Sequence, residues 1–490
     1  MLELDIPEHW EWRPIENLGE WKGGGTPKKS NPEYWDGGEI PWVSPKDMKQ
    51  SRIRDTQDAI TEFALEDTTA KLIPEDSIII VTRSGILEHS LPVAVNHLPV
   101  TVNQDLKAFI PNKEVSSEYL LFFFQAFEKK ILKDCSKDGT TVASINSDSL
   151  YEYKIPLPPL KEQTRIVQRL DQLTTQIDAG ISTLNESREQ INSYELAVIS
   201  AAINGELTES WRESQSTSMK SDDVKREILE KRQDQWESLH SSRYSPPEAP
   251  ERNLEELPDD WTEMSVEELS YKTRYGTSEK CDYDFDGPPV LRIPNIESGS
   301  IDLEDMKYAD HESDLSNIDP LSRGDFLVVR TNGSKNLIGR AGLVEEDFES
   351  PHYFASYLIR FRLVDVGILP EWINLVWQGP EIRSKIIKKA STSAGQYNLS
   401  QSKILDFQLP IPPEPEQREI LKKVEHRLSI IEDVSQMVDT EIQRASNFRV
   451  SVLRKGFRGD LTQQSEASDS QGTENENAES IKTQVKLNDF

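Results

Sequence analysis

Three groups of polar and basic residues in this 490-residue chain have side chains suited to binding a phosphate backbone or a base edge. They lie in turn-rich segments, two of which directly follow β-branched runs that we predict to be strands. Lysine, arginine, serine and threonine donate to phosphate oxygens, while arginine and asparagine also pair with base edges. The candidates are Lys22, Thr26, Lys28, Lys29, Arg83, Ser84, Thr331, Asn332, Ser334 and Lys335. Any one of them alone is typical of an ordinary surface loop, so the prediction rests on their occurrence in matching places of a repeat.

Catalytic and metal-binding patterns are missing from the sequence. There is no phosphate-binding P-loop and no GxGxxG at the start of a predicted helix. The NPEY segment at Asn31 differs by one residue from an amino-methyltransferase motif, but no glycine-rich cofactor loop accompanies it. Glu128 and Lys130 lack the preceding aspartate that would complete a metal site, and the seven histidines show no metal-binding spacing. We therefore expect a binding protein with no catalytic residue, no metal and no cofactor of its own.

The composition indicates a folded, strongly acidic protein. Lys and Arg number 56 against 86 Asp and Glu, a formal charge of −30, which by itself argues against a nucleic-acid partner unless the basic groups are concentrated locally. Cys135 and Cys281 are isolated, as expected in a reducing compartment. The apolar runs near Ile79 and Phe123 are far shorter than the ~20 residues of a membrane span. We expect a soluble, cytoplasmic protein that does not enter a membrane.

The elements that must position these residues occur twice. IPLPPLKEQTRIVQRL, from Ile155, returns as LPIPPEPEQREILKKV, from Leu409, and NGELT returns as RGDLT. The separation is 254 residues at both ends, since Gly205 in the first copy corresponds to Gly459 in the second. The segments before these copies also match, with smaller insertions and deletions, although NQDLK at Asn103 has no evident counterpart in the second copy. Two copies of one domain plus one helix are therefore predicted.

Each copy should end in a helix of roughly 45 residues, or about 68 Å at ~1.5 Å per residue. Prolines at 158 and 159 fit a helix start, and Asn204-Gly205 is typical of a helix end. Apolar residues recur every seven positions, which predicts a pairing seam. The seam residues are Leu170, Ile177, Leu184, Ile191 and Val198, then Val424, Ile431, Val438, Ala445 and Val452. Ile166, Leu173 and Tyr194 suggest a second line. The other copy, running antiparallel, is the obvious partner; alternatively, each helix packs only on its own globular domain.

The segments before the helices predict mixed α+β domains. SIIIVT near Ile79 and DFLVVR near Phe326 are typical of strands, as are GEIPWV, PPVLRIP and the segment 92–110. Helices are expected over 119–131 and 372–387, and a short charged helix over 221–236. Strands and helices do not alternate regularly, which argues against a parallel α/β sheet. The fold class is therefore α+β, with two pseudo-repeated domains separated by two long antiparallel coiled-coil helices.

These motifs together resemble the DNA-specificity subunit of type I restriction–modification systems. GGGTPKKSNPEYWDGGEIPW and VNQDLKAFIP are similar to that family's target-recognition domain, and PLPPLKEQTRIVQRL is similar to the start of its helical region. The resemblance covers nearly the whole chain. The resemblance does not extend to the tail, whose polar composition predicts disorder. Together, the resemblance and the composition divide the chain into a first target-recognition domain (1–157), a spacer helix (158–207), a linker with a short helix (208–255), a second target-recognition domain (256–411), a second spacer helix (412–461) and a disordered acidic tail (462–490).

The resemblance implies a non-catalytic subunit whose two domains each read one half of a bipartite, asymmetric site in double-stranded DNA. It would assemble with two methyltransferase (M) subunits and with restriction/translocase (R) subunits. S-adenosylmethionine, ATP and Mg²⁺ would belong to those partners. The alternative, which the acidic composition favours, is a tandem-domain coiled-coil interaction protein without a DNA role.

Overall fold

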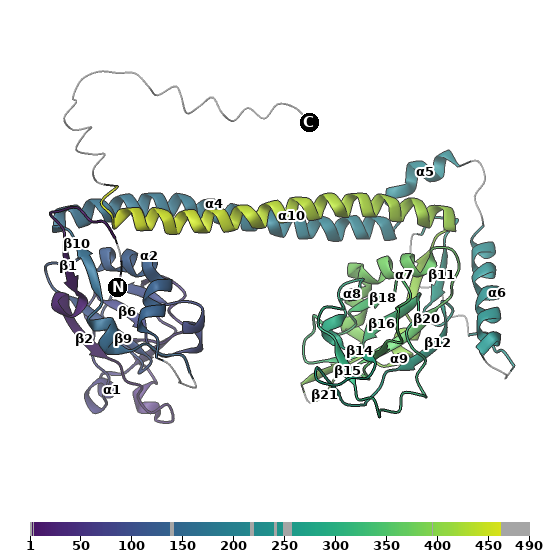
Figure 1. Cartoon of the computed structure of the whole chain (residues 1–490), viewed down its shortest axis with the longest axis horizontal. Helices are drawn as coiled ribbons and strands as arrows, with labels where there is room; N and C mark the ends of the chain where they lie inside the picture. The colour runs from purple at the N-terminus through teal and green to yellow at the C-terminus, as the bar shows by residue number, and fades with distance from the viewer. Residues whose placement is uncertain are drawn as a thin grey trace, which may run out of the picture. The chain divides into compact units, whose positions relative to one another are not determined.

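The computed structural model describes Leu2 and residues 4–137, 142–215, 220–239, 243–247, 257–393 and 395–461. The predicted acidic tail, 462–490, lies outside the described residues. The chain forms two compact units. Unit 1 comprises Met1–Glu186 and Asp439–Phe490, and unit 2 comprises Ser187–Val438. Each unit therefore contains one mixed domain together with part of each long helix (Figure 1).

Unit 1 is built on a five-stranded sheet and a three-stranded sheet. The larger sheet has the order β2 (Gly19–Gly23), β9 (Leu106–Pro111), β6 (Ile78–Val81), β7 (Val93–Asn96) and β4 (Arg52–Ile53). The smaller sheet has the order β5 (Asp58–Ile60), β3 (Ile40–Val43) and β8 (Thr101–Val102). A separate antiparallel pair joins β1 (Glu11–Pro14) to β10 (Lys154–Leu157). The helices of this domain are α1 (Glu62–Asp67), α2 (Ser117–Cys135) and α3 (Ser147–Tyr151).

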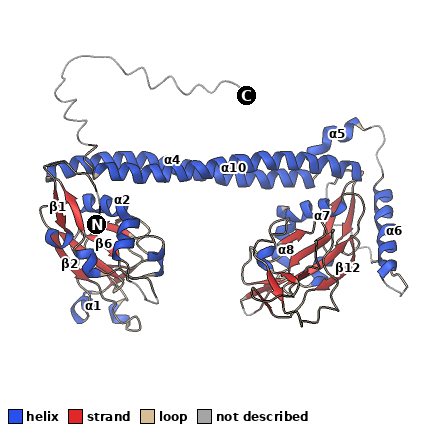
Figure 2. Cartoon of the chain, in the orientation of Figure 1, coloured by secondary structure: helices blue, strands red, loops and turns tan. Residues whose placement is uncertain are grey.

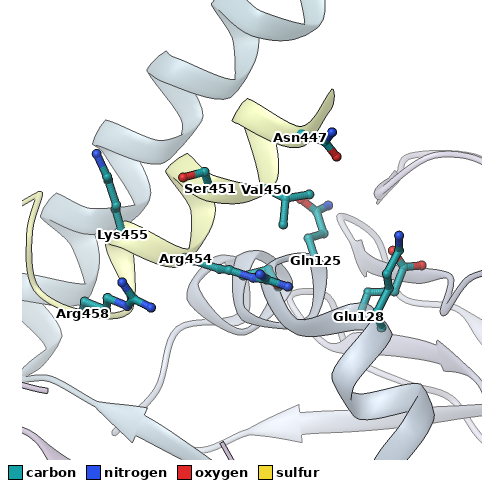
Figure 3. A pocket seen from close by; sticks show the side chains of 10 residues that line it. Gln125, Glu128, Asn447, Val450, Ser451, Arg454, Lys455 and Arg458 are labelled. Atoms are coloured by element: carbon teal, nitrogen blue, oxygen red, sulfur yellow. The ribbon is translucent and has the colours of Figure 1, made fainter. Parts of the chain in front are cut away.

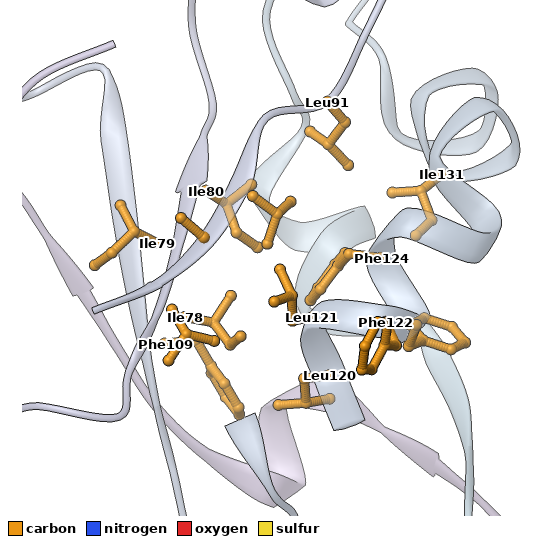
Figure 4. Close-up of a cluster of buried hydrophobic side chains, with 14 of the residues drawn as sticks. Ile78, Ile79, Ile80, Leu91, Phe109, Leu120, Leu121, Phe122, Phe124 and Ile131 are labelled. Atoms are coloured by element: carbon orange, nitrogen blue, oxygen red, sulfur yellow. The ribbon is translucent and has the colours of Figure 1, made fainter. Parts of the chain in front are cut away.

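The core of unit 1 lies where α2 packs on the larger sheet. All four residues of β6 are fully buried, which explains why this strand reads as a continuous apolar run instead of an alternating one. Ile78 and Phe109 lie on neighbouring strands, and Leu121 and Phe124 of α2 point toward them (Figure 4). The predicted strands near Ile79 and over 92–110 are thus confirmed by position, and α2 is longer than the predicted helix.

Unit 2 repeats this plan. Its central sheet has the order β12 (Ser270–Tyr275), β20 (Leu358–Leu363), β16 (Asp325–Val329) and β18 (Ala341–Leu343). A second sheet has the order β13 (Cys281–Asp282), β15 (Lys307–Ala309), β14 (Pro289–Leu291) and β19 (Tyr353–Phe354). The remaining strands are β11 (Thr262–Ser265) with β23 (Gln408–Ile411), and β17 (Thr331–Asn332) with β22 (Gln396–Asn398) and β21 (Ser391–Ser393). The helices are α5 (Glu209–Ser214), α6 (Ser221–Leu239), α7 (Leu369–Gln378), α8 (Pro380–Lys389) and α9 (Gln401–Leu405).

Strand register identifies the counterpart of the NQD segment that sequence comparison leaves unplaced. Val81 pairs with Leu106 in unit 1, and Val329 pairs with Leu358 in unit 2. The strand before each of these turns also matches, because β8 lies parallel to β3 just as β19 lies parallel to β14. The three residues between the paired strands are 103–105 in unit 1, so their counterpart is 355–357, Ala-Ser-Tyr. Sequence similarity is absent there, but the backbone path is the same.

The predicted helix over 372–387 is wrong as one element. The structure has two helices, α7 and α8, separated by Gly379 in an extended conformation, with Pro380 beginning the second helix. Proline cannot donate to the preceding turn, so the break is expected from local chemistry. In unit 1 the corresponding helix α2 is a single element, but its backbone is kinked at Phe127, which has non-helical dihedral angles. Both domains thus bend this helix near the same place.

The short charged helix α6 packs on unit 2. Its Val224 and Ile228 are buried, and the guanidinium Nε of Arg232 donates to the carbonyl of Ser270 at 2.9 Å. Lys225 forms a 2.7 Å ion pair with the buried Glu268. The charged pattern of this segment gave no sign of these contacts.

The two long helices, α4 (Leu160–Ile203) and α10 (Glu414–Gly456), pair antiparallel as predicted (Figures 1 and 2). In unit 1 the end of α10 meets the first half of α4, where Arg449 Nε donates to Asp178 Oδ1 at 2.7 Å. In unit 2 the start of α10 meets the end of the first repeat, where Lys423 Nζ donates to the carbonyl of Leu207 at 3.0 Å. Both helices also contribute to the domain cores, so pairing and packing on the domains occur together.

Burial along the helices supports the strict seam and corrects the second line. Five seam residues are buried, namely Leu170, Val198, Val424, Ile431 and Val452. The other five are half-buried, namely Ile177, Leu184, Ile191, Val438 and Ala445. In the second line Ile166 is fully buried, but Tyr194 is 55% exposed. In an α-helix, residues spaced by seven rotate about the helix axis by ~20° per repeat. The second line of apolar residues therefore turns out of the helix–helix interface before the seam does.

The repeated glycine and P-x-x-W motifs meet across the two copies. Gly205, at the end of α4, has φ +74°, and a Cβ there would lie 2.9 Å from Pro258 Cγ and 3.1 Å from the ring of Trp261. Gly459, after α10, has φ +82°, and a Cβ there would lie 2.6 Å from Pro7 Cγ. Each domain is therefore closed by the helix end of the other repeat. Glycine is required at both junctions by its positive φ and by the close approach of the prolines.

Candidate nucleic-acid interface

The loop after β2 in unit 1 carries the first group of candidates. Lys22 lies on β2 opposite Ala108, and Lys28 and Lys29 are exposed in the following loop. The loop leaves the strand at Gly24, where a Cβ would come within 2.0 Å of the Asn103 carbonyl oxygen. Thr26 then donates to the side-chain oxygen of Gln104. The loop is thereby fixed against the turn that joins β8 to β9.

The end of β6 brings the second group to the same turn. The backbone N–H groups of Thr82 and Arg83 donate to the carbonyl of Asp105, at 2.8 and 3.2 Å. The Arg83 guanidinium lies 3.4 Å from the Asp105 carboxylate and remains 66% exposed. The hydroxyl of Ser84 caps the short helix that follows by accepting from the N–H of Ile86. Thr26 and Arg83 thus converge on residues 103–105, whereas Ser84 has a local structural role.

Gln104 is a candidate that the sequence-based selection omitted. It is exposed, it accepts from Thr26, and its amide nitrogen lies 3.4 Å from Asp105 Oδ2. An exposed glutamine held by its neighbours is suited to bidentate pairing with adenine. Asn103, next to it, is buried and bonds back to Asp105, so its role is to shape the turn. The only sequence signal was the VNQDLK segment itself, which indicated a family pattern without naming the exposed residue.

The third group lies after β16 in unit 2. Thr331 and Asn332 form β17 and pair with Asn398 and Tyr397 of β22. The side-chain oxygens of Asn332 and Ser334 accept backbone N–H groups two residues further on, at 2.8 and 3.2 Å. The Lys335 ammonium lies 5.7 Å from the ring centroid of Tyr397 and is exposed. The asparagine and serine therefore stabilise the loop, and Lys335 supplies its charge.

Three further residues of unit 2 lie at the counterpart of the turn in unit 1. Arg330 Nη1 donates to the carbonyl of Ser356 at 3.2 Å, and the Arg330 guanidinium lies 4.7 Å from the ring centroid of Tyr275. Tyr275 is 39% exposed and Tyr357 is 53% exposed. By register Arg330 replaces Thr82 and Tyr357 replaces Asp105. Matched positions thus carry a hydroxyl and a carboxylate in unit 1 but a guanidinium and a phenol ring in unit 2, and Ser356 takes the place of Gln104.

Among the described residues, no group of three or more histidine, cysteine, aspartate or glutamate side chains is placed to hold a metal ion. Burial raises the pKa of the Cys135 thiol to about 11 and also raises the pKa of Cys281, so both thiols are protonated at neutral pH. Among the helices described, none is both long and apolar enough to cross a bilayer.

The two units share one topology but carry different polar groups at matched loops. The comparisons show which known proteins the chain is similar to. Residues 7–187 match the type I restriction modification DNA specificity domain. The chain is 42% identical to the EcoR124I/EcoR124II specificity subunit of Escherichia coli over 187 residues, which span 38% of this chain and 46% of that subunit.

A second relative covers almost the whole chain. The EcoKI specificity subunit of E. coli strain K12 is 26% identical over 462 residues, or 94% of this chain and 90% of that subunit. A chain from a solved type I restriction–modification system shares the fold with a TM-score of 0.61 at 15% identity, and the match covers 94% of this chain and 100% of that chain. The chain is thus similar to specificity subunits of type I restriction enzymes, through the family model over residues 7–187 and through the EcoKI subunit over almost its whole length.

Proposed function

We propose that this chain is a non-catalytic subunit that reads a bipartite, asymmetric site in double-stranded DNA, one half with each unit. The observation that carries the proposal is the difference between matched loops. Gln104 and Arg83 surround the turn in unit 1, and Arg330 and Tyr357 surround its counterpart in unit 2. Two half-sites of different sequence require different side chains to contact the bases, and the two units present such side chains on the same backbone fold.

The partners follow from the same proposal. Two methyltransferase subunits and the restriction/translocase subunits carry out methylation and cleavage in the cytoplasm, and S-adenosylmethionine, ATP and Mg²⁺ bind to them. We propose that residues 1–157 and 256–411 are target-recognition domains. Residues 158–207 and 412–461 would be the spacer helices between them. Comparing the methylated motifs of host cells with and without the gene tests the function, because loss of one bipartite motif is expected. An unchanged methylation pattern would favour an interaction protein without a DNA role.

Lysines 28 and 29 should contact phosphates. We expect Lys28→Ala with Lys29→Ala to weaken binding of the assembled complex to all duplexes alike and to lower the salt slope by about one unit per lost contact. Both side chains are exposed in the loop that Thr26 fixes to the turn at Gln104. Electrophoretic or fluorescence binding assays at several salt concentrations measure the effect.

The matched control changes two exposed lysines of the same domain. Lys113 follows β9 and Lys154 begins β10, at the opposite end of the β2–β9 pair from the loop of Lys28. Replacing both by alanine should leave the salt slope as it was. Equal slopes for the test and control variants would remove Lys28 and Lys29 from the interface.

The helix pair should set the separation of the two half-sites. Two recognition domains on one face of a duplex contact major grooves about one turn, ~10 bp, apart. The base pairs between these grooves are not recognised. We expect four residues inserted near Ser187, with four inserted near Val438 to preserve the pairing, to lengthen the preferred spacer or abolish methylation. Sequencing of methylated sites measures the spacer. If the spacer stays unchanged in an active variant, the helices do not determine it.

A further inference from the structure

A cavity of about 480 Å³ lies in unit 1 where α2 meets the last turns of α10 (Figure 3). Its lining includes four cationic side chains, Lys129, Arg454, Lys455 and Arg458. Glu128 is the carboxylate of this lining, and one of its oxygens already accepts from the N–H of Leu91 at 2.6 Å. The cavity is therefore positively charged, although the whole chain carries a formal charge of −30.

All four cations are exposed at the cavity. Within the described part of the chain, no carboxylate forms an ion pair with any of them. Arg454 Nε donates to the carbonyl of Ala126 at 3.1 Å, which leaves the rest of its guanidinium beside the cavity. Four like charges close together repel one another, so an anion that binds among them is favoured.

The lining also offers a hydrogen-bond acceptor. The side-chain oxygen of Gln125 is buried and has no hydrogen-bond partner among the described residues. Buried polar atoms are nearly always hydrogen-bonded, so this oxygen is suited to accept from a bound group. A molecule that fits the cavity would combine negative charge with a hydroxyl or amino donor.

The end of a helix explains these cations only in part. Lysine and arginine in a last helical turn interact favourably with the helix dipole. However, the first repeat has Ser200, Ala201 and Asn204 where the second has Arg454, Lys455 and Arg458, at the same separation of 254 residues. In unit 2 a cavity near the end of α4 has Glu206, Glu381 and Lys385 as its charged lining residues. The basic set is therefore specific to unit 1 and is not required for ending this type of helix.

We propose that this cavity binds a small phosphate-bearing molecule of the size of a nucleoside diphosphate. Its volume lies within the range of small-ligand sites, ~300–1,000 Å³, and arginine pairs well with phosphate oxygens. Gln125 and the second oxygen of Glu128 would accept from the sugar or base. The site is separate from the turn at Gln104 and adds a ligand to the proposed DNA-reading function.

Calorimetric titration of the full-length chain tests the site with three probes: ADP, pyrophosphate and adenosine. ADP and pyrophosphate should bind with Kd below about 1 mM, and adenosine should bind much more weakly. Lys455→Ala with Arg458→Ala should weaken ADP binding by ~10-fold or more, since two phosphate contacts are lost. Arg454 is left unchanged because it joins α10 to α2. Lys385→Ala, in the unit 2 cavity, is the matched control and should bind ADP like the parent chain.

Three results overturn the proposal. The first is the absence of saturable ADP and pyrophosphate binding. The second is an unchanged ADP affinity in a double variant whose circular dichroism matches that of the parent. The third is a double variant that loses affinity for duplex DNA together with a reduced salt slope. In that case the cations contact the DNA backbone. Normal DNA binding with lost ADP binding supports a separate small-molecule site.

Discussion

Replacing Glu416 by alanine should cost unit 2 about 3 kcal/mol of unfolding free energy. Glu416 is 2% exposed and accepts from Trp261 Nε1 at 2.9 Å and from Thr208 Oγ1 at 2.7 Å. Its carboxylate also pairs with Arg212 at 2.5 Å. Removing it leaves the buried indole N–H of Trp261 without its acceptor, and this loss is large because the donor stays out of water. The Thr208 hydroxyl and the Arg212 guanidinium keep only longer hydrogen bonds, to Gly205 and to Thr208. Denaturant unfolding followed by tryptophan fluorescence measures the change.

The repeat provides a matched control for this substitution. Glu162 is the residue 254 positions earlier, where it lies 2.9 Å from His9. The Glu162 side chain is 14% exposed and the His9 side chain is 60% exposed, so solvent screens the pair. We expect Glu162→Ala to cost roughly 1 kcal/mol or less. Glu416→Gln keeps one acceptor and should give an intermediate loss. Equal losses for both alanine variants would mean that the buried network does not stabilise unit 2.

A chain ending near Ser210 should form a two-fold dimer that directs methylation to a palindromic site. It would retain one reading domain and one helix, and that helix has the same seam period as its natural partner. In unit 1 the natural partner supplies Val452, Leu453 and Phe457 to the core. The residues 254 positions earlier are Val198, Ile199 and Ile203, all apolar. A second copy of the fragment can therefore fill the same places.

Phe457 predicts how weak this dimer should be. Its ring centroid lies 5.1 Å from that of Tyr119 and 5.5 Å from that of Phe123, inside the core. In the dimer Ile203 of the second copy would replace it and leave a partial cavity, at about 1–2 kcal/mol per site. Ile203→Phe should fill that cavity and tighten the dimer by ~10-fold or more. Light scattering across concentrations measures association, and sequencing with the methyltransferase partner shows the methylated site.

The half-length prediction can fail in two ways. A fragment that remains monomeric at high concentration and yields no palindromic methylation would show that the helices recognise each other by features beyond the shared seam. An Ile203→Phe fragment no tighter than the parent fragment would show that the Phe457 position does not limit association. Ile203→Val, which removes volume at the same place, is the control and should weaken association further.

The sequence alone determined the repeat, the class of each domain and the long helices. The equal separation of 254 residues at two places implied two copies without an internal gap in the helices. Heptad spacing predicted a pairing seam, for which the other copy, running antiparallel, was the obvious partner. Runs such as that at Ile79 identified buried strands because burial on both faces leaves a continuous apolar pattern. These features are local or periodic, so the order of residues records them directly.

Only the tertiary structure decided which single residues meet. The counterpart of the turn at Gln104 lies at 355–357, where none of the three residues is identical. The backbone follows the same course in both units because the neighbouring strands are paired in the same register. Glu416 meets Thr208 from 208 positions away, and the cationic cavity joins α2 to the end of α10 across more than 300 positions. Such contacts have no period and depend on how the helix end of one repeat closes the domain of the other. The physical reason is that a lone charged or aromatic residue has the same sequence signature on a solvated face as in a buried network, and only its neighbours in space distinguish the two.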